Sequence, residues 1–205
     1  MRVPAPAPLD FDHPPADPVP LVRRWLVEAE GSGLPNPNAM TVATVDSSGQ
    51  PSARILLLRG FDDRGAVFFT NRRSRKGRDL AGNGLVALLL HWDPLDRQIR
   101  IEGRVAPVED AESDAYFAGR PRESQLNAWA SEQSEPVASR AVLLARQQEA
   151  RDRFEGRPVP RPPHWGGYRV ALHRIELWQG DRFRLHDRIV YARVDSGWQV
   201  ARLCP

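Results

Sequence analysis

The strongest constraint on the fold is a series of short, apolar, β-branched segments separated by turn-forming residues. Residues 39–45 (AMTVATV) precede the turn DSSGQP and a second apolar segment at 52–58, and FDDRG then precedes a third at 66–70. Runs of this kind, bounded by Gly, Pro, Asp and Ser, are typical of antiparallel strands joined by tight turns. The early part of the chain is therefore predicted to form a β-sheet.

The segments that follow predict helices inserted between two sets of strands. Further strands are expected at 85–92 and 97–108, and closing strands at 168–178, 184–194 and 198–203. Apolar residues at helical spacing predict a helix at 21–29, and more helices are expected at 74–83, 111–118, 122–130 and 139–154. This order favours a mainly β fold with helices (α+β), built as an antiparallel barrel that its C-terminal hairpin closes.

The 205 residues are enough for one compact domain, which is expected at 21–205. Residues 1–20 hold seven prolines and are predicted to be a flexible leader. No apolar run reaches membrane-spanning length, and the N-terminus lacks the apolar core of a secretory signal. The single cysteine, Cys204, can form no internal disulfide. These features predict a cytoplasmic protein without a membrane partner.

The formal net charge is +3, and Lys76 is the only lysine, so the basic character comes almost entirely from arginine. The densest basic cluster, NRRSRKGR at 71–78, has the composition of a nucleic-acid patch. However, acidic residues are spread along the chain, and there is no extended basic tail. A compact phosphate-bearing ligand is therefore favoured over nucleic acid.

A polar run near the C-terminus, IELWQGDRFRLHDR at 175–188, is the strongest functional signal. Its chemically active side chains are Trp178, Gln179, Arg184, His186, Asp187 and Arg188. Each polar group needs a partner when it is desolvated, so a purely structural strand has no use for so many. Arginines that flank a histidine and an aspartate suit an anionic small molecule or a redox centre.

Arg54 and Arg59 bracket the apolar segment RILLLR. Because side chains alternate along a strand, these two arginines are expected to point to opposite faces. They cannot both serve one ligand atom without a bend in the strand. Taken alone, the segment is better explained as a buried strand with solvated ends.

Two further clusters offer groups that bind phosphate. The first places hydroxyls and two cations at a predicted helix start: Thr70, Ser74, Arg75 and Lys76. An exposed, capped helix would account for this cluster equally well. The second surrounds two predicted helix starts: Tyr116, Arg120, Arg122, Ser124 and Gln133. It indicates either an anion site or a solvated helix-turn-helix.

Several common catalytic arrangements are missing from the sequence. No glycine-rich phosphate loop and no GxSxG nucleophile motif occur. The five histidines are scattered and the lone cysteine offers no CxxC pair, so no metal site is expected. Anion sites and aromatic groups without a nucleophile point to a bound organic cofactor that performs the chemistry.

Taken together and in chain order, these clusters resemble the pyridoxine (pyridoxamine) 5′-phosphate oxidase family. The similarity begins near Asp17-Pro18 and reaches the C-terminal Arg202-Leu203-Cys204-Pro205. The most specific motifs are Asn71 with Ser74-Arg75-Lys76, RPRESQ at 120–125, Trp129 with Gln133-Ser134, WGGYRV at 165–170, and ELWQG leading to RLHDR.

The resemblance implies a six-stranded antiparallel split β-barrel with peripheral helices, in a homodimer that holds one FMN per subunit at the interface. The residues it places around FMN are Arg54, Ile55, Leu56, Leu57, Phe69, Thr70, Arg75, Lys76, Gln98, Gln133, Ser134, Trp178 and Arg188. Those it places around the substrate are Arg59, Tyr116, Arg120, Ser124, Arg184, Leu185 and His186, with Arg184 and His186 catalytic. Arg54 would then serve the cofactor and Arg59 the substrate, which accounts for their opposite faces.

The activity implied by the resemblance is oxidation of pyridoxine or pyridoxamine 5′-phosphate to pyridoxal 5′-phosphate, with hydride transfer from C4′ to flavin N5 and with O2 reduced to H2O2. Two features depart from the family pattern. Arg59 stands where the family has lysine, which changes the reach and shape of the cation. The leader also lacks the tyrosine and most of the basic residues of the arm that covers the substrate in the family.

Two other functions remain open at this point. A paralogous FMN oxidase of secondary metabolism, of the phenazine-biosynthesis type, would oxidise a dihydro-aromatic substrate. Such a substrate lacks phosphate and would not need the intact RPRESQ motif and Tyr116. A non-catalytic flavin or pyridoxal phosphate binding module would not need Arg184 and His186. The vitamin B6 salvage oxidase is the preferred hypothesis.

Overall fold

The computed structural model describes residues 9–205. Its helices are α1 (Val19–Glu30), α2 (Arg75–Gly82), α3 (Asp110–Ala118), α4 (Arg122–Ala130) and α5 (Arg140–Arg153), with a 3₁₀ turn at Asp93–Leu95. Its strands are β1 (Ala39–Val45), β2 (Pro51–Leu57), β3 (Gly60–Asp62), β4 (Gly65–Asn71), β5 (Leu85–Trp92), β6 (Arg97–Pro107), β7 (Trp165–Val170), β8 (Arg174–Gln179), β9 (Asp187–Val194) and β10 (Gly197–Arg202).

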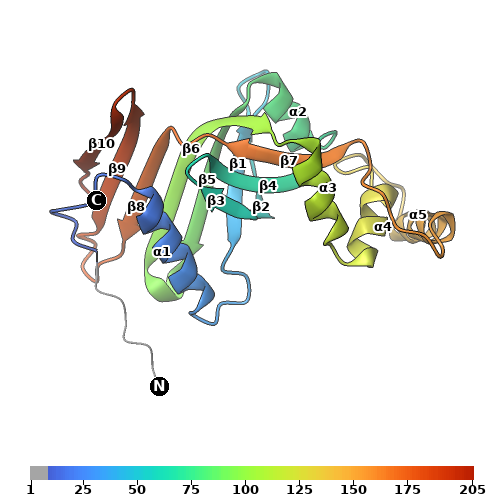
Figure 1. Cartoon of the computed structure of the whole chain (residues 1–205), viewed down its shortest axis with the longest axis horizontal. Coiled ribbons are helices and arrows are strands. Elements are labelled where there is room, and N and C mark those ends of the chain that lie inside the picture. The colour runs from blue at the N-terminus through green and yellow to red at the C-terminus, as the bar shows by residue number, and fades with distance from the viewer. Residues whose placement is uncertain (1–8) are drawn as a thin grey trace.

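The strands form one curled antiparallel sheet (Figure 1). Its barrel part follows the order β2-β1-β5-β6-β7-β4, which supplies the six strands expected. The long strand β6 pairs with β8 through its first half and with β7 near its end. Strands β8, β9 and β10 extend the sheet beyond the barrel, at the left of Figure 1. The predicted antiparallel split barrel with peripheral helices is therefore confirmed.

The main core lies inside the curl of the sheet, because one face of each strand is apolar. In β1, Met40, Val42 and Thr44 are buried while the residues between them are only half-buried, which is the period of two of a strand. Helix α1 covers part of the sheet with Val22 and Trp25, both fully buried. Burial of one large apolar side chain contributes about 1.5–3 kcal/mol, so this face holds α1 in place.

A second, smaller core joins α3, α4 and α5 to β7 and forms what we call the helical lobe, at the right of Figure 1. Its buried members are Phe117, Leu126, Ala150, Phe154, Val159 and Trp165. Trp165 is the first residue of β7, so the lobe is attached directly to the barrel sheet. This attachment fixes α3 and α4 relative to β4, the strand next to β7.

Two boundaries differ from the sequence prediction for clear reasons. The segment predicted as one strand at 168–178 forms two strands, because the chain switches partners along β6 around Leu172. The strand predicted from Arg184 begins only at Asp187, because Arg184 adopts a left-handed conformation (φ 67°) within a loop. The short strand β3, inside the predicted FDDRG turn, was not foreseen.

The predicted leader falls partly outside the described residues, since the structure begins at residue 9. Within the described part, Phe11 packs into the main core, and the Tyr191 hydroxyl donates a hydrogen bond of 3.1 Å to the Pro15 carbonyl. Helix α1 begins at Val19, two residues before the predicted helix start at residue 21. Pro20 permits this because proline is compatible with the first turn of a helix.

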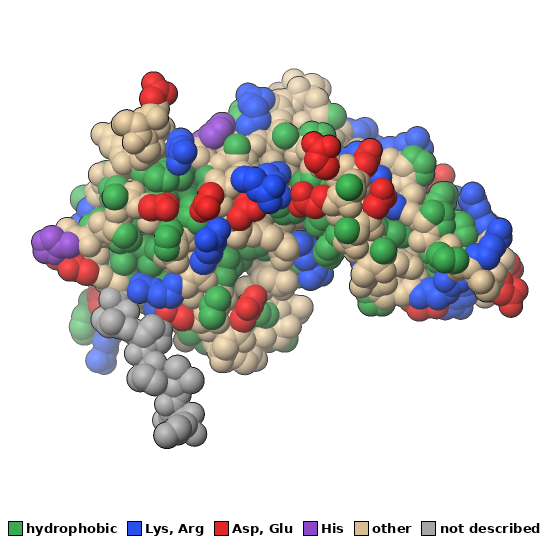
Figure 2. Space-filling view, viewed as in Figure 1, with side chains coloured by type: hydrophobic (Ala, Val, Ile, Leu, Met, Phe, Trp, Pro, Cys, Tyr) green, Lys and Arg blue, Asp and Glu red, His purple; other side chains and the backbone are tan. Residues whose placement is uncertain are grey.

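Acidic and basic side chains are interspersed over the face shown in Figure 2. In the described part of the chain, no helix combines the length and the apolar character needed to cross a bilayer.

Candidate active site

A cavity of about 510 Å³ lies between the barrel and the helical lobe. Strands β2 and β4 supply one side of it, and helices α3 and α4 supply the other. The lining residues are Ile55, Leu56, Leu57, Arg59, Phe69, Thr70, Asn71, Tyr116, Arg120, Ser124, Asn127, Ala128, Ser131, Gln133 and Trp165. The cavity thus brings together the four residues expected to bind the substrate phosphate and six of those expected to bind FMN.

Three nearly parallel aromatic rings line this cavity. The ring centroids of Phe69 and Tyr116 are 4.0 Å apart with an interplanar angle of 5°. The Trp165 ring is 5.6 Å from Phe69 at 9°. Gly167 makes this arrangement possible, because a Cβ atom there would lie 2.7 Å from the Phe69 ring. Stacked rings fix one another, so the cavity has a rigid apolar side.

The guanidinium groups of two arginines lie over these rings. The Arg120 guanidinium lies 4.7 Å from the centroid of the Trp165 ring, and that of Arg59 lies 5.8 Å from the centroid of Tyr116. Burial lowers the pKa of Arg120; Tyr116 raises that pKa, and Arg59 lowers it. The Arg120 Nη1 atom is buried and has no hydrogen-bond partner among residues 9–205. A buried donor of this kind is satisfied by an anionic ligand.

A second cationic group adjoins the cavity at the start of α2. The Ser74 hydroxyl caps the helix by accepting a hydrogen bond from the Gly77 amide at 3.3 Å, as the sequence predicted. The buried Lys76 Nζ donates to Ser74 Oγ at 3.1 Å and to Gln133 Oε1 at 2.7 Å. Thr70 also contacts Gln133, at 3.4 Å. Gln133 therefore links this cluster to the cavity.

The environment of Lys76 disfavours its positive charge. Its pKa is lowered to about 8, mainly by burial and also by the positive charge of Arg54, while the Asp79 carboxylate partly opposes the shift. Lys76 forms no direct ion pair with a carboxylate within the described chain. A desolvated cation without a carboxylate contact fits a phosphate dianion, so these residues suit the phosphate of a nucleotide-like cofactor.

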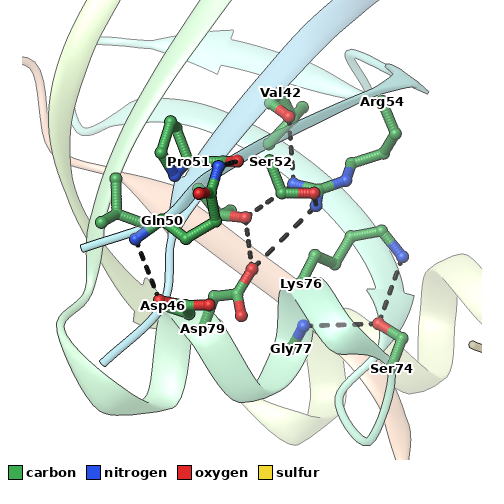
Figure 3. A network of polar contacts seen from close by, with 12 residues as sticks. Val42, Asp46, Gln50, Pro51, Ser52, Arg54, Ser74, Lys76, Gly77 and Asp79 are labelled. Atoms are coloured by element: carbon green, nitrogen blue, oxygen red, sulfur yellow. Dashed lines mark hydrogen bonds and ion pairs between the residues drawn. The ribbon is translucent and has the colours of Figure 1, made fainter. Parts of the chain in front are cut away.

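Arg54 lies on the opposite face of β2 from Ile55 and is held by a network of polar contacts (Figure 3). Its Nη1 donates to the Thr44 hydroxyl at 2.7 Å and to the Val42 carbonyl at 3.1 Å. Its Nη2 donates to the Ser52 hydroxyl at 2.8 Å. Arg59 lies beyond the end of β2 and lines the cavity, so the two arginines have separate surroundings.

The remaining predicted site residues lie on β6, β8, β9 and the loop between β8 and β9. They are Gln98, Trp178, Arg184, Leu185, His186 and Arg188. The Trp178 and His186 rings are 4.6 Å apart, and His186 Nδ1 accepts a hydrogen bond from the Asp181 amide at 3.0 Å. Leu185 and His186 line a second cavity, of about 590 Å³, together with the C-terminal residues Arg202, Leu203, Cys204 and Pro205.

Within one chain, the two groups of predicted residues line different cavities. The first cavity holds the aromatic rings with Arg59 and Arg120, and the second holds Leu185 and His186. The two cavities share no lining residue. Ser134 and Arg184, one near each group, both have positive φ angles of 78° and 67°. Such conformations are uncommon for residues other than glycine and are frequent at functional sites.

The cavity also contains residues that sequence reasoning missed. Asn127, Ala128 and Ser131 line it on the same side as Ser124. Asn127 and Ala128 follow Ser124 at spacings of three and four residues, which places them on one face of α4, and Ser131 is the residue at the C-terminal cap of that helix. That helical spacing is a signal in the sequence from which Asn127 and Ala128 could have been found.

Comparison with known proteins agrees with this arrangement. Residues 27–154 match the family described as Pyridoxamine 5'-phosphate oxidase, and residues 165–205 match the Pyridoxine 5'-phosphate oxidase C-terminal dimerisation region. The chain is 57% identical to a pyridoxine/pyridoxamine 5'-phosphate oxidase of Rubrobacter xylanophilus, over 92% of this chain and 87% of that protein. It is 58% identical to one of Cupriavidus necator, over 92% of this chain and 89% of that protein.

Among solved structures, the chain is similar to PhzG from Burkholderia lata 383, determined in complex with tetrahydrophenazine-1-carboxylic acid. The TM-score is 0.90 at 36% identity, with 100% of this chain and 99% of that chain covered. A pyridoxamine 5'-phosphate oxidase-related, FMN binding protein from Nostoc punctiforme has the same fold, with a TM-score of 0.72 at 16% identity over 91% of this chain and 96% of that chain. The sequence match and the cavity together show that this chain belongs to the pyridoxamine 5'-phosphate oxidase family.

Proposed function

We propose that the protein is an FMN-dependent oxidase that converts pyridoxine or pyridoxamine 5′-phosphate to pyridoxal 5′-phosphate with O2 as the electron acceptor. When bound, FMN supplies the hydride acceptor for C4′ of the substrate and passes the electrons to O2, which gives H2O2. The side chains of this protein would bind, orient or shield the reacting groups.

The cofactor phosphate would be held by Arg54, Arg75 and Lys76, with the helix start at Ser74 as a further donor. Two observations support this assignment. Lys76 is buried without an ion pair to a carboxylate of the described chain, and its Nζ contacts Gln133, which lines the cavity. The isoalloxazine ring would lie along Ile55, Leu56 and Leu57 in the cavity, and Gln98, Trp178 and Arg188 would come from the partner chain.

The substrate phosphate would be bound by Arg59, Tyr116, Arg120 and Ser124. The single observation that carries the proposal is that Arg120, whose buried Nη1 has no partner in the described chain, lines the same cavity as Leu56 and Thr70. A buried cation beside a rigid aromatic surface suits a flat ring that carries a phosphate. Anchoring that phosphate would fix C4′ near the flavin, and correct placement of reacting atoms is a large part of catalysis.

Arg184 and His186 would approach the substrate ring from the other chain of a homodimer. A permanently charged guanidinium can orient the oxygen or nitrogen on C4′ and favour its uncharged form, from which hydride leaves more readily. The Asp181 amide donates its hydrogen bond to Nδ1 of His186, which fixes the orientation of the ring. The other ring nitrogen, Nε2, takes no part in that bond. The family match of residues 165–205 to a dimerisation region supports a two-chain site.

A second function has specific support. The similarity to PhzG over the whole chain fits an oxidase that acts on a dihydro-aromatic acid without phosphate. Two observations favour the B6 substrate instead. The curated relatives that carry the pyridoxine/pyridoxamine name are more similar in sequence, at 57–58% against 36%. The cavity also places two arginines beside its aromatic rings, and a phosphate dianion would pair with both of them more fully than a single carboxylate would.

The test is an anaerobic mixture of the purified, flavin-loaded protein with pyridoxine 5′-phosphate, followed by exposure to air. The proposal expects the visible flavin absorbance to bleach and then to recover, with pyridoxal 5′-phosphate formed. Unphosphorylated pyridoxine serves as the matched control and should bleach the flavin far more slowly. A flavin that stays oxidised with pyridoxine 5′-phosphate, and bleaches with a dihydrophenazine carboxylic acid, would replace the proposal with the second function.

A further inference from the structure

Thr44 is a fully buried residue whose hydroxyl contacts both Arg54 and Asp79. Its Oγ1 accepts a hydrogen bond from Arg54 Nη1 at 2.7 Å and donates one to Asp79 Oδ2 at 2.6 Å. A threonine hydroxyl has only one proton, so the direction of both bonds is fixed by chemistry. Arginine can only donate and an ionised carboxylate can only accept. The hydroxyl therefore connects a cation to an anion through one shared atom.

Asp79 brings the helix that carries Lys76 into this network. The two side chains are three residues apart on α2, and the Asp79 side chain is only 5% exposed. Its Oδ2 also lies 4.0 Å from Arg54 Nη2. Asp79 thus contacts Arg54 of β2 from the helix that carries Lys76, and its charge opposes the effect by which Arg54 lowers the pKa of Lys76.

The charges of this cluster match the ligand proposed for it. Arg54, Arg75 and Lys76 contribute three positive charges and Asp79 one negative charge, which leaves a net charge of +2. A phosphate monoester carries about −1.5 to −2 at neutral pH. Asp46 is also near Arg75, but its Oδ1 already accepts hydrogen bonds from the Ser48 and Gln50 amides.

We infer that Thr44 and Asp79 are positioning residues for the phosphate site: Thr44 fixes the guanidinium of Arg54, and Asp79 holds Thr44 and keeps Arg54 and Lys76 together. Neither residue needs to touch the ligand. This inference rests on the proposed binding of FMN, since it assigns the cluster to the cofactor phosphate. It extends that proposal to two residues outside the cavity.

The first test compares FMN with riboflavin, which has the same ring system and no phosphate. In Thr44→Val, every charge of the cluster is kept while Arg54 loses its hydroxyl acceptor. FMN should bind to the flavin-free full-length variant at least tenfold more weakly, the effect of losing one hydrogen bond to a charged group. Riboflavin should bind as in the wild type. Thr44→Ser should restore FMN affinity, because it keeps the hydroxyl.

Thr41→Val is the matched control, since Thr41 is on the same strand with its side chain on the opposite face. It should leave the affinity of both flavins unchanged. Equal losses for FMN and riboflavin in Thr44→Val, or no loss for either, would overturn the role of Thr44. A wild-type protein that binds neither flavin would instead overturn the proposed function, so the two failures are distinguishable.

The second test uses the fact that Lys76 is the only lysine of the chain. With ¹³C-labelled lysine, one side-chain NMR signal reports its titration in the flavin-free protein. Asp79→Asn removes the negative charge but keeps an oxygen that can accept the hydrogen bond from Thr44. Because the Asp79 charge raises the pKa of Lys76, that pKa should fall below its wild-type value in the variant. Asp46→Asn is the control and should leave the titration unchanged. An unshifted Lys76 pKa in Asp79→Asn would overturn the role of Asp79, even if Thr44→Val failed to fold.

Discussion

The Nζ atom of Lys76 lies 2.7 Å from Oε1 of Gln133, a residue 57 positions later in the chain. This contact joins the start of α2 to the segment that follows α4. It places the proposed cofactor phosphate site directly beside the cavity in which Arg59 and Arg120 would bind the substrate phosphate. The two proposed anion sites are therefore neighbours.

FMN binding should weaken as the pH rises above about 8. Lys76 has a pKa of about 8 in the flavin-free protein, below its ordinary value of 10.5, and only its protonated form attracts phosphate. Above that pKa, binding must also take up a proton, so the Kd for FMN should rise by up to about tenfold per pH unit. Fluorescence titrations with FMN between pH 7 and 10 would measure this.

Riboflavin and the Lys76→Arg variant are the controls for this pH effect. Riboflavin has no phosphate, so its affinity should not follow the same curve. Arginine stays charged throughout the range, so FMN binding by Lys76→Arg should be independent of pH. A wild-type FMN affinity that stays constant up to pH 10 would contradict a phosphate contact of Lys76.

Replacement of Arg120 should impair binding of the phosphorylated substrate specifically. Arg120→Met keeps an apolar contact with Trp165 but removes the buried cation, so KM for pyridoxine 5′-phosphate should rise by roughly a hundredfold. Steady-state kinetics would measure KM and kcat, and flavin content should remain that of the wild type.

Arg122 provides the matched control within the same RPR sequence. Its guanidinium donates to the carbonyls of Phe154 and Arg157, so its role is to hold the helical lobe together. Arg122→Met should lower the thermal stability and leave KM close to the wild-type value. Equal KM effects in the two variants would show that Arg120 also acts only through the lobe.

Replacement of Arg184 should affect turnover and not flavin binding. Arg184→Ala should keep its flavin and lose about a hundredfold or more in kcat, the usual cost of a lost transition-state contact. Arg182→Ala changes a neighbouring arginine that contacts the Phe183 ring and should turn over normally. Unchanged turnover in Arg184→Ala would remove Arg184 from the mechanism.

Mixtures of two inactive variants should regain activity if each site uses two chains. In a heterodimer of Arg120→Met and Arg184→Ala, one site carries both defects and the other carries neither. Random exchange of subunits in an equal mixture should therefore restore about one quarter of the wild-type activity. Mixing after denaturation and refolding, followed by an H2O2 assay, would measure this. A mixture that remains inactive, although heterodimers form, would place Arg120 and Arg184 in separate roles within one chain.

Much of the local structure could be predicted because it depends on neighbouring residues. The β-branched, apolar run AMTVATV identified β1, and the Ser74 cap identified the start of α2. The separate surroundings of Arg54 and Arg59 could not follow from strand alternation alone, because β2 ends at Leu57, before Arg59. The strand boundaries that were predicted wrongly depend on pairing with strands far away in sequence. An example is the change of pairing along β6 that divides β7 from β8.

The sequence by itself determined the types of group that could meet: cations, hydroxyls and aromatic rings without a nucleophile, in an order that resembles one family. Only the tertiary structure decided which of them share a cavity, which donor of Arg120 is left without a partner, and that Thr44 joins Arg54 to Asp79. The physical reason is that strand and helix periodicity fixes the direction of a side chain relative to its own segment. Distances between segments are set by how β4, β7 and the helical lobe pack, and that packing depends on the whole chain at once.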